Sequence, residues 1–573
     1  MLSTTKKLIV DIETTVLPVD KIWMVGTLDF QTDEVKTFTY PINKKELQEC
    51  LDQYDEIVGH NFIDFDAPVL TKLADISFSS GLEIIDTLIL SRLQNPQREG
   101  GHSLKAWGER LEFPKGDYDD WSNFNSKMLE YCINDLKLTK KVYTTLSESL
   151  APFGNTSIDL EHKVQAIITK QVEQGWLLDK EKCLSLLGDL KSRQMNVEEK
   201  VREVFKPLPV FVKEITPRYK KDGSLSTVGL KFLGDEIANV CGTFSRVSFK
   251  EFNLGSRQQI GKHLQFFGWK PVDFTEKNHP IVDEKVLSKV IGEYLLLQKR
   301  IAQVYSWFLA VDDKDARVHG YVNTIGAVTG RMTHSSPNMA QVPSVYSPYG
   351  DQCRGCWIVP KGYKLVGVDA AGLELRMLAH YMDDKEYTDA ILHGDIHTTN
   401  QEAAGLETRD SAKTFIYAFL YGAGDAKIGS IVGGSKGDGA KLKRVFLENT
   451  PSLRVLRERV TNASVRGYLK GLDKRKLIIR SSHAALNTLL QSAGAIVMKK
   501  ALTILDEYAT LHKVDYKFVG NIHDEFQVEV KEEQAEKFGW LAVECIKAAG
   551  IQFNLNCPLD GEYKVGNTWA ETH

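Results

Sequence analysis

The sequence predicts a multidomain protein, with an α/β N-terminal part and an α+β remainder. Three observations support this prediction. The chain has 573 residues, well above a typical domain size of roughly 100–200 residues. Its first 150 residues alternate short apolar runs with helical stretches, which is typical of α/β folds. From about residue 320 onward, strand-like runs such as KLVGVDA and EFQVEV alternate with long helical patterns.

The N-terminal part contains five short apolar runs, of which we interpret the first three as strands; the last two lie between helical stretches. These runs are KKLIVDIETT, IWMVGTLDF, DEVKTFTY, EIVGHN and LEIIDTLIL. The Pro/Gly/Ser-rich segment SLAPFGNTS then predicts a domain boundary, which we place at residue 155. The first run carries Asp11 and Glu13 soon after its apolar core, so it reads as a strand and not as a signal peptide.

The middle of the chain is mostly helical in pattern. A helical period runs from about residue 160 to 205 and returns after about residue 255. Residues 206–255 lose that period and contain PLP, PRYKKDG and a Gly-rich mixture. We interpret residues 206–255 as an insertion or a mobile loop.

The charge is unevenly distributed along the chain. Residues 1–150 carry 16 Lys/Arg against 25 Asp/Glu, and the rest carries 56 against 51. A polyanion would therefore have to bind in a local groove, because neither part is strongly basic. No run of about 18 apolar residues is present, so we expect no membrane span. Eight scattered cysteines suit a reducing compartment, which predicts a cytoplasmic protein.

Carboxylates in the N-terminal part form an ordered set. Asp11 and Glu13 lie two apart on a strand and face one side. Asp66 follows in HNFIDFD, and Tyr131 and Asp135 share one face of a predicted helix. Four converging carboxylates would repel one another unless hard divalent cations bound them. Two such ions can drive an in-line phosphoryl displacement, with Tyr131 orienting the attacking water.

Two simpler interpretations apply to this set. Each carboxylate taken alone is most often a surface residue without a shared role. Asp64 lies close to Asp66 in the sequence and could be mistaken for it, although the motif spacing favours Asp66.

A second constellation lies in the C-terminal part. Asp369 ends the apolar run KLVGVDA, and Asp524 lies in the link between two predicted strands. Aspartates at such strand ends can bind two Mg²⁺ ions. A stripe at helical spacing in RDSAKTFIYAFLYGAG consists of Arg409, Lys413, Tyr417 and Tyr421. Its cations suit a triphosphate. The simpler alternative is an amphipathic helix with a solvated basic edge.

Taken together, these motifs resemble two enzyme families. DIET, HN-x4-D and YxxxD resemble the three motifs of the DEDD-type 3′→5′ exonucleases in their Tyr variety, over roughly residues 7–140 with DTLILSRL. The three later segments resemble motifs A, B and C of family A DNA polymerases, the group of bacterial DNA polymerase I. VTGRMTHSSPNMAQVP, SPYGDQCR, GDIHTTNQ and HAALNTLLQSAGA extend the likeness toward replicative polymerases of T-seven-like short-tailed bacteriophages.

The resemblance implies a fold and domain order. It implies an RNase H-like exonuclease domain at 1–155, followed by a right-hand polymerase. Within the polymerase, the thumb would span 156–320 with the insertion 206–255, the palm 321–385 and 487–573, and the fingers 386–486.

The resemblance also implies roles for individual residues. Asp369, Asp524 and Lys413 would be catalytic in synthesis, and the exonuclease residues would be Asp11, Glu13, Asp66, Asp135 and Tyr131. The metal ligands would be the six aspartates and glutamates of the two sites together with the Ala370 carbonyl. The deoxynucleotide would contact Arg409, Lys413, His397, Tyr417, Glu374 and Ala370. Glu374 would exclude a ribose 2′-hydroxyl, and Tyr417 is linked in the family to acceptance of dideoxynucleotides.

DNA contacts are implied for a further group, namely Arg331, Gln491, His523 and Tyr421. The first three would probe the minor groove, where every Watson–Crick pair presents acceptors in nearly the same places. Tyr421 would stack near the template base.

The implied cofactor is Mg²⁺, two ions per active site, with Mn²⁺ as a substitute. The implied partners are primer–template DNA, deoxynucleoside triphosphates, a processivity factor at the thumb insertion, and a phage helicase–primase and single-strand-binding protein. The insertion is short and only modestly basic, which argues against thioredoxin as that processivity factor. For a phage-encoded protein, the compartment would be the host bacterial cytoplasm.

Two other functions are compatible with parts of the sequence. A single-subunit RNA polymerase shares the palm, but Glu374 and the exonuclease motifs argue against it. A catalytically silent DNA-binding accessory protein could keep the fold, but every metal carboxylate of both sites is present.

Overall fold

The structure is a computed structural model. It describes residues 5–79, 81–204, 206–226, 242–251, 253–266, 268–271, 274–275, 279–282 and 289–573. The chain divides into two compact units. One unit comprises Met1–Asp179 and Ala310–His573, and the other comprises Lys180–Leu309.

The N-terminal part is built on a five-stranded sheet. Its strands are β1 (Lys7–Thr14), β2 (Ile22–Asp29), β3 (Val35–Thr39), β4 (Glu56–Gly59) and β5 (Glu83–Asp86). The order is β3-β2-β1-β4-β5. β1, β2 and β3 pair antiparallel, whereas β4 pairs parallel with β1 and β5. β1, β2 and β3 are the three predicted strands, whereas β4 and β5 lie in the two further apolar runs, the second of which continues into helix α3 (Thr87–Gln94).

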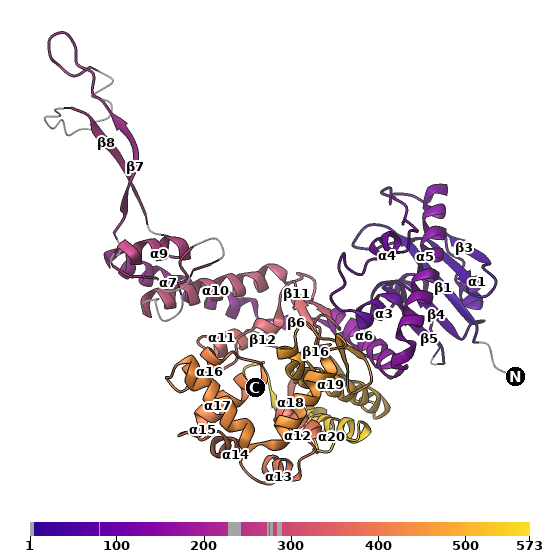
Figure 1. The fold of residues 1–573 in the computed structure, drawn as a ribbon. Helices are drawn as coiled ribbons and strands as arrows, with labels where there is room; N and C mark the ends of the chain where they lie inside the picture. Colours follow the sequence, from indigo (N-terminus) through magenta and orange to yellow (C-terminus); the bar gives the residue numbers. More distant parts are fainter. Residues whose placement is uncertain are drawn as a thin grey trace. The chain divides into compact units, whose positions relative to one another are not determined.

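Helices pack against this sheet (Figure 1). They are α1 (Lys44–Leu51), α2 (Ala67–Ala74), α3 (Thr87–Gln94), α4 (Leu104–Arg110) and α5 (Ser126–Leu150), with the short turns η1 (Phe62–Asp66) and η2 (Ala151–Phe153). Asn125 caps α5, since its side chain accepts a hydrogen bond from the backbone of Met128. Two apolar clusters fill the space between sheet and helices.

Helix α6 (Thr156–Gln174) belongs to the same unit as the C-terminal part. Leu160, Val164 and Ile168 on its apolar face are buried in one cluster with strand and helix residues of that part. The sequence analysis assigned 156–320 to a single domain. In the structure the separate compact unit is Lys180–Leu309, because burial of these side chains ties α6 to the C-terminal core.

The smaller unit is helical with a β-ribbon. It contains α7 (Lys180–Val204), β7 (Leu208–Ile215), β8 (Phe244–Lys250), α9 (Arg257–Phe266) and α10 (Lys289–Ala310). β7 and β8 pair antiparallel, from Leu208 opposite Lys250 to Ile215 opposite Phe244. Within this unit the ribbon extends away from the helices (Figure 1). The sequence analysis interpreted 206–255 as an insertion or mobile loop; its described parts contain this ribbon, whereas 227–241 and 252 lie outside the described residues.

The C-terminal part is built on a four-stranded antiparallel sheet of order β16-β17-β13-β18. Its strands are β13 (Tyr363–Ala370), β16 (Tyr516–Ile522), β17 (Glu525–Lys531) and β18 (Gly561–Gly566). The long helices α19 (Ala485–Leu511) and α20 (Ala535–Gln552) lie against each other, and α20 also lies against β13 and β18. The predicted antiparallel sheet is therefore present.

In the sequence, a set of helices lies between strands β13 and β16. They are α12 (Leu373–Met382), α13 (Lys385–His393), α14 (Ile396–Ala404), α15 (Arg409–Leu420), α16 (Asp425–Ile431), α17 (Lys436–Asn449) and α18 (Pro451–Ser464). The remaining short elements are β6 (Trp176–Leu178), β9 (Arg317–Val318), β10 (Tyr321–Asn323), β11 (Thr333–Ser335), η3 (Met339–Gln341), α11 (Gly350–Arg354), β12 (Trp357–Ile358), β14 (Tyr468–Lys470), β15 (Lys476–Ile478), η4 (Ser482–Ala484) and η5 (Glu532–Gln534).

One helical stretch among the described residues, Ser482–Leu511, is long and apolar enough to cross a membrane. However, 89% of its most apolar window is buried inside the protein. Its burial is that of a core helix, since α19 contributes many residues to the main apolar cluster.

Candidate active sites

Two aspartates lie at the same end of the C-terminal sheet. Asp369 is near the end of β13, where it pairs with Glu525 of β17. Asp524 lies in the two-residue turn between β16 and β17. The backbone N–H of Ala370 donates to the Asp524 carbonyl at 3.1 Å, so the two chain segments are fixed side by side. The sheet register therefore brings the carboxylates of both predicted strand ends together.

The electrostatics of this pair favour a cation. Burial, together with the neighbouring Glu525 and Asp524, raises the pKa of Asp369 to about 7. Burial also raises the pKa of Asp524, although Arg331 partly offsets the effect. Asp524 Oδ1 is buried and has no hydrogen-bond partner within the described part of the chain. Closely spaced carboxylates with unsatisfied oxygens are the donor set that a divalent ion would neutralise.

Glu374 and two neighbours form a polar cluster beside Asp524. Glu374 is in the first turn of α12, and its Oε1 accepts a 2.5 Å hydrogen bond from the Tyr421 hydroxyl. Arg331 Nη2 lies 3.5 Å from the same oxygen and 3.9 Å from Asp524 Oδ1. The Glu374 carboxylate is thus held by one hydroxyl and one guanidinium close to the aspartates.

The predicted stripe on α15 is present. Thr408 caps the helix at the backbone of Ser411, and the helix ends at Leu420, so that Tyr421 is its C-cap residue. The rings of Tyr417 and Tyr421 stack with centroids 6.4 Å apart. Arg409 and Lys413 are exposed at the other end. The stripe therefore runs from two solvent-facing cations to two rings, the second of which contacts Glu374.

Arg409 is engaged by a carboxylate of the neighbouring helix. Its Nε and Nη2 lie 2.6 and 3.1 Å from the two oxygens of Asp395. This contact holds the pKa of Asp395 well below its usual range. His397 follows Asp395, and burial with the nearby Arg409 and Lys413 cations lowers its pKa. The cations and His397 therefore gather on one side of α14 and α15.

The residues predicted to probe DNA are placed as follows. Arg331 and His523 line the same small cavity, of about 30 Å³, next to Asp524. His523 has a left-handed backbone, with φ of 58°, which the tight turn between β16 and β17 requires. Gln491 is half-buried on α19, which packs against α12.

The N-terminal carboxylates converge from three elements. Asp11 and Glu13 lie on β1, two residues apart, opposite Gly26 and Met24 of β2. Asp66 ends the π-helical turn η1, and Tyr131 and Asp135 lie one helical turn apart on α5. Asp135 and Asp66 both act electrostatically on the β1 pair. The structure thus brings all four predicted carboxylates into one cluster.

This cluster carries a strong electrostatic cost. Burial first, and then Asp135, raises the pKa of Asp11 to about 7, and burial with Asp11 and Asp135 raises the pKa of Glu13 to about 10. Burial also raises the pKa values of Asp66 and Asp135. Glu13 Oε1 and Asp135 Oδ1 are buried without a hydrogen-bond partner among the described residues. These residues fit divalent cations, which prefer such oxygen donors.

Asp64 and Asp66 have different surroundings. Asp64 Oδ1 accepts hydrogen bonds from Thr169 Oγ1 at 2.7 Å and from Gln165 Nε2 at 3.2 Å, both on α6. Asp66 is buried beside Asp11. The geometry therefore favours Asp66, as the motif spacing does, and gives Asp64 a contact with α6 instead.

Three residues near the sites are missing from the sequence predictions. Lys115 Nζ lies 2.6 Å from Asp135 Oδ2. The second missed residue is Cys132, whose Sγ lies within 4.8 Å of carboxylate oxygens of Asp11 and Glu13. The third is Glu525, which lies opposite Asp369 in the sheet. Its Oε1 accepts a 2.8 Å hydrogen bond from the Trp569 indole. The DE pair in IHDEF could have indicated Glu525, whereas Lys115 is a single lysine between helices and carries no sequence signal.

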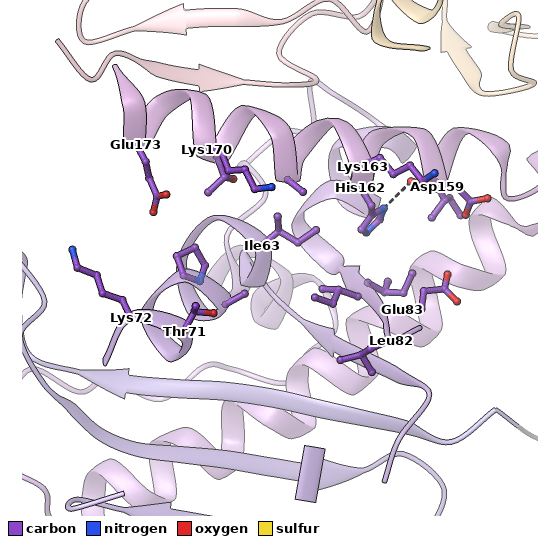
Figure 2. A pocket seen from close by; sticks show the side chains of 17 residues that line it. Ile63, Thr71, Lys72, Leu82, Glu83, Asp159, His162, Lys163, Lys170 and Glu173 are labelled. Carbon is purple, nitrogen blue, oxygen red and sulfur yellow. Dashed lines mark hydrogen bonds between the residues drawn. The ribbon is translucent and has the colours of Figure 1, made fainter. Parts of the chain in front are cut away.

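A large groove lies elsewhere, between α6 and the elements α2 and β5 (Figure 2). Its volume is about 1000 Å³. Figure 2 shows Lys163, Lys170 and Glu173 projecting from α6, with Thr71 and Lys72 opposite. None of the predicted site residues lines it, and its floor is mostly apolar. The charged groups on its rim are of both signs, and include Lys72, Lys170 and Glu173.

Comparison with known proteins relates both halves of the chain to characterised groups. The model of DNA polymerase family A matches residues 230–571, and that of the RNase_H superfamily matches residues 8–147. The chain is 37% identical to the DNA-directed DNA polymerases of Escherichia phage T7 and Enterobacteria phage T3. Each alignment covers 90% of this chain and 92% of the relative.

A solved structure gives a second comparison. It is the POL domain of Pol1 from M. smegmatis in complex with DNA primer-template and dNTP. The TM-score is 0.77 at 18% identity, over 100% of this chain and 97% of that one. At this identity the likeness concerns the fold alone.

Proposed function

This chain belongs to DNA polymerase family A, and from that premise we propose how its two carboxylate clusters share DNA synthesis and proofreading. The protein is a DNA-directed DNA polymerase with an RNase H-like exonuclease domain. The observation that carries the proposal is that each half of the chain has one cluster of buried, mutually repelling carboxylates. We assign synthesis to the Asp369 and Asp524 cluster and 3′→5′ hydrolysis to the Asp11 cluster.

In the polymerase site, Asp369, Asp524 and the Ala370 carbonyl would hold two Mg²⁺ ions, with Mn²⁺ as a substitute. When bound, such ions lower the pKa of the primer 3′-hydroxyl and neutralise charge on the triphosphate. The primer 3′-hydroxyl loses its proton to solvent, its oxygen forms a bond to the α-phosphorus, the bond from that phosphorus to the oxygen bridging to the β-phosphate breaks, and pyrophosphate leaves. The unsatisfied Asp524 Oδ1 supports this assignment.

We place the triphosphate along the cationic end of α15. Lys413 would neutralise charge on the phosphates. Arg409 contacts both oxygens of Asp395, the geometry with which a guanidinium also binds a phosphate. Arg409 would therefore release Asp395 and bind the triphosphate in its place. His397 lies beside these two cations. Tyr417 would lie at the sugar. Lys413 contributes to catalysis by opposing the charge that grows on the leaving pyrophosphate.

Sugar and base-pair selection would take place around Glu374. Its carboxylate is fixed by Tyr421 and Arg331, so it forms a rigid wall that a 2′-hydroxyl would meet. Tyr421 would stack near the template base. Arg331, Gln491 and His523 would contact minor-groove acceptors, which have nearly the same positions in every Watson–Crick pair. A mismatch displaces those acceptors and slows extension.

In the exonuclease site, Asp11, Glu13, Asp66 and Asp135 would hold a second pair of divalent ions. Tyr131 would orient the attacking water, since it lies on α5 one turn before Asp135. The water oxygen bonds to phosphorus and the bond to the primer 3′-oxygen breaks. The products are a shortened primer and a nucleoside 5′-monophosphate.

The domain assignment follows from these sites. We propose an exonuclease domain at 1–155, a thumb at 156–320, a palm at 321–385 and 487–573, and fingers at 386–486. The substrates would be primer–template DNA and deoxynucleoside triphosphates. Because the relatives are phage DNA polymerases, we place replication in a host bacterial cytoplasm. A helicase–primase and a single-strand-binding protein are further partners that we propose.

A processivity factor would dock on the ribbon of the smaller unit. Phe211 is 60% exposed and Phe249 is 69% exposed on β7 and β8. A two-stranded ribbon is marginally stable alone, and exposed apolar side chains on it mark an interaction surface.

The experiment uses a labelled primer with one mismatched 3′ nucleotide on a longer template. With Mg²⁺ and all four deoxynucleotides, we expect removal of the mismatched nucleotide followed by extension to the template end. Without deoxynucleotides we expect degradation only, and EDTA should stop both. Extension of the mismatched primer without prior excision would contradict the proofreading assignment.

A further inference from the structure

Lys115 occupies the exonuclease cluster although it belongs to none of the motifs. It lies between α4 and α5. Its Nζ is 2.6 Å from Asp135 Oδ2 and 4.8 Å from the centroid of the Tyr131 ring. The Lys115 side chain is only 21% exposed and that of Asp135 only 3%. An ammonium is thus held between the two residues that α5 contributes to the site.

The segment that carries Lys115 is anchored to the site by several contacts. The Asn134 side chain on α5 donates to the Pro114 carbonyl at 3.2 Å. Tyr118 packs its ring 5.6 Å from Tyr131 and 4.9 Å from Trp121. The Trp121 carbonyl in turn accepts from the Trp23 indole at 2.9 Å. Lys115 is therefore placed by a packed segment, unlike an unrestrained surface lysine.

The Lys115 ammonium lies beside a cluster of carboxylates. A lysine side chain is charged at neutral pH, and this one is 2.6 Å from Asp135 Oδ2. Lys115 in turn lowers the pKa values of Asp11, Glu13 and Asp135, against the larger effect of burial. One fixed positive charge is therefore part of the cluster before any divalent ion binds.

The contact with Asp135 leaves one oxygen of that carboxylate for another ligand. Lys115 contacts Oδ2, whereas the buried Oδ1 has no hydrogen-bond partner in the described ranges. When divalent ions neutralise the carboxylates, the attraction between Asp135 and Lys115 weakens. The next anion to enter the site is the phosphate of the terminal primer nucleotide, which a lysine can meet as a point charge.

We propose that Lys115 is a catalytic residue of the exonuclease, whose ammonium contacts the phosphate of the terminal nucleotide during hydrolysis. The inference rests on the proposed Asp11 cluster as the exonuclease site. As water bonds to phosphorus and the bond to the 3′-oxygen breaks, negative charge grows on the phosphoryl and leaving oxygens. The attacking water gives up one proton to solvent, and the leaving 3′-oxygen takes one proton from solvent. A fixed ammonium opposes that charge without having to reorganise.

The alternative role is that of a placeholder, in which Lys115 only neutralises the cluster until ions bind. The two roles differ once the site is saturated with ions. A placeholder is dispensable at saturating Mn²⁺, and its removal makes ions bind more tightly. A catalytic ammonium is still required at saturation.

The test compares full-length wild type with K115M, K115R and K105M. Lys105 is a matched control, because it lies nearby on α4 with its side chain 65% exposed, in a 3.5 Å surface contact with Asp117. Two quantities are measured without deoxynucleotides: Mn²⁺ affinity by calorimetry, and kcat for degradation of a single-stranded oligonucleotide at saturating Mn²⁺.

For K115M we expect unchanged or tighter Mn²⁺ binding together with a fall of about 100-fold in kcat, the size typical for loss of one transition-state donor. K115R should recover part of the rate, and K105M should match wild type. Wild-type kcat for K115M at saturation would overturn the proposal, as would a loss that disappears when more Mn²⁺ is added. If K115M does not fold, K115Q replaces it with the same two outcomes.

A parallel D11A–E13A variant separates failure of the inference from failure of the site. If that variant keeps nuclease activity, the proposed exonuclease site is wrong, and the inference falls with it. If D11A–E13A is inactive while K115M has wild-type kcat, the site stands and only the role of Lys115 is overturned.

Discussion

Asp369 and Asp11 lie in different halves of the chain, yet each has its pKa raised to about 7. In both cases the first cause is burial and the second is a neighbouring carboxylate. Each charged carboxylate therefore costs folding free energy until a cation offsets it. The same buried carboxylates that we propose as cation ligands therefore destabilise the protein when no cation is bound.

This destabilisation predicts a pH-dependent effect of divalent ions on stability. When a carboxylate has a higher pKa in the folded than in the unfolded protein, its contribution to stability is complete below the unfolded pKa of about 4. That contribution is lost as the pH rises from there through the folded pKa. The loss is complete near pH 7 for Asp11 and Asp369, and near pH 10 for Glu13. We expect Mg²⁺ to raise the melting temperature more at pH 8.5 than at pH 6, measured by calorimetry against EDTA. Equal rises at both pH values would contradict this explanation.

At the residue scale, the sequence predicts groups that come in ordered sets and misses those that come singly. Asp11 and Glu13, and likewise Tyr131 and Asp135, could be found because strand and helix periodicity place each pair on one face. Asp66 was found from the spacing of the motif that resembles the DEDD-type exonucleases. Lys115 could not, since its contact with Asp135 depends on how the segment between α4 and α5 packs. The pairing of Arg409 with Asp395 was missed for the same reason.

At the element scale, the two aspartates near η1 make a sharp prediction. Asp66 faces the carboxylate cluster, whereas Asp64 accepts hydrogen bonds from α6. We expect D66N to lower exonuclease turnover by at least about 100-fold, because a cation ligand is lost, and D64N to keep it within about threefold. Degradation of a labelled single strand measures both. A more severe loss in D64N than in D66N would reverse the assignment.

The contact between α14 and α15 predicts a change in nucleotide affinity. Asp395 holds Arg409 and also caps α14 through the backbone of His397. D395N keeps an N-cap residue but removes the ion pair, which is weak because both side chains are solvent-exposed. We expect the KM for deoxynucleotides to fall by up to about fivefold with kcat unchanged, in steady-state single-nucleotide insertion. A higher KM would mean that Asp395 assists binding.

Strands such as β1, β2, β13 and β17 could be predicted because their apolar runs are long and bounded by turns. The ribbon of β7 and β8 could not. Its strand VFVKEI lies among Pro, Gly and charged residues, and its side chains are exposed, so no burial pattern marks it. The sequence pattern predicts a strand when one face of that strand is buried, and it carries no strand signal when both faces are exposed.

At the scale of the whole molecule, a buried ionic network joins distant segments. Glu161 of α6 contacts Lys499 of α19 at 2.7 Å and Arg475 at 2.6 Å. Arg475, at the β14–β15 turn, also contacts Asp473 at 2.7 Å. All four side chains are at most 3% exposed, and burial lowers the pKa of Lys499 to about 8. The network explains why α6 belongs to the C-terminal core.

This network predicts a large stability loss in K499M. The substitution leaves a buried net negative charge, which typically costs about 3–5 kcal/mol. Urea unfolding monitored by tryptophan fluorescence measures the loss. The double variant E161Q–K499M should recover part of it, because the uncompensated charge is removed. Additive losses in the double variant would mean that the two residues do not interact.

The positions at which one compact unit ends and the next begins are harder to predict from the sequence than the family of each half of the chain. The sequence divides the chain at breaks in pattern, such as the one near residue 155. The two compact units of the structure change at Asp179 and at Leu309 instead. An apolar helix face such as that of α6 does not say which core it joins, because that depends on long-range contacts that no local pattern records.

The central claim is that two separate carboxylate clusters perform two separable reactions. The most direct measurement follows a 5′-labelled primer–template in D369A and in D11A–E13A, with Mg²⁺ and with or without deoxynucleotides. D369A should degrade the primer at the wild-type rate and lose extension by at least about 1000-fold, whereas D11A–E13A should extend it and lose degradation. Loss of both activities in either folded variant, or of neither, would contradict the account.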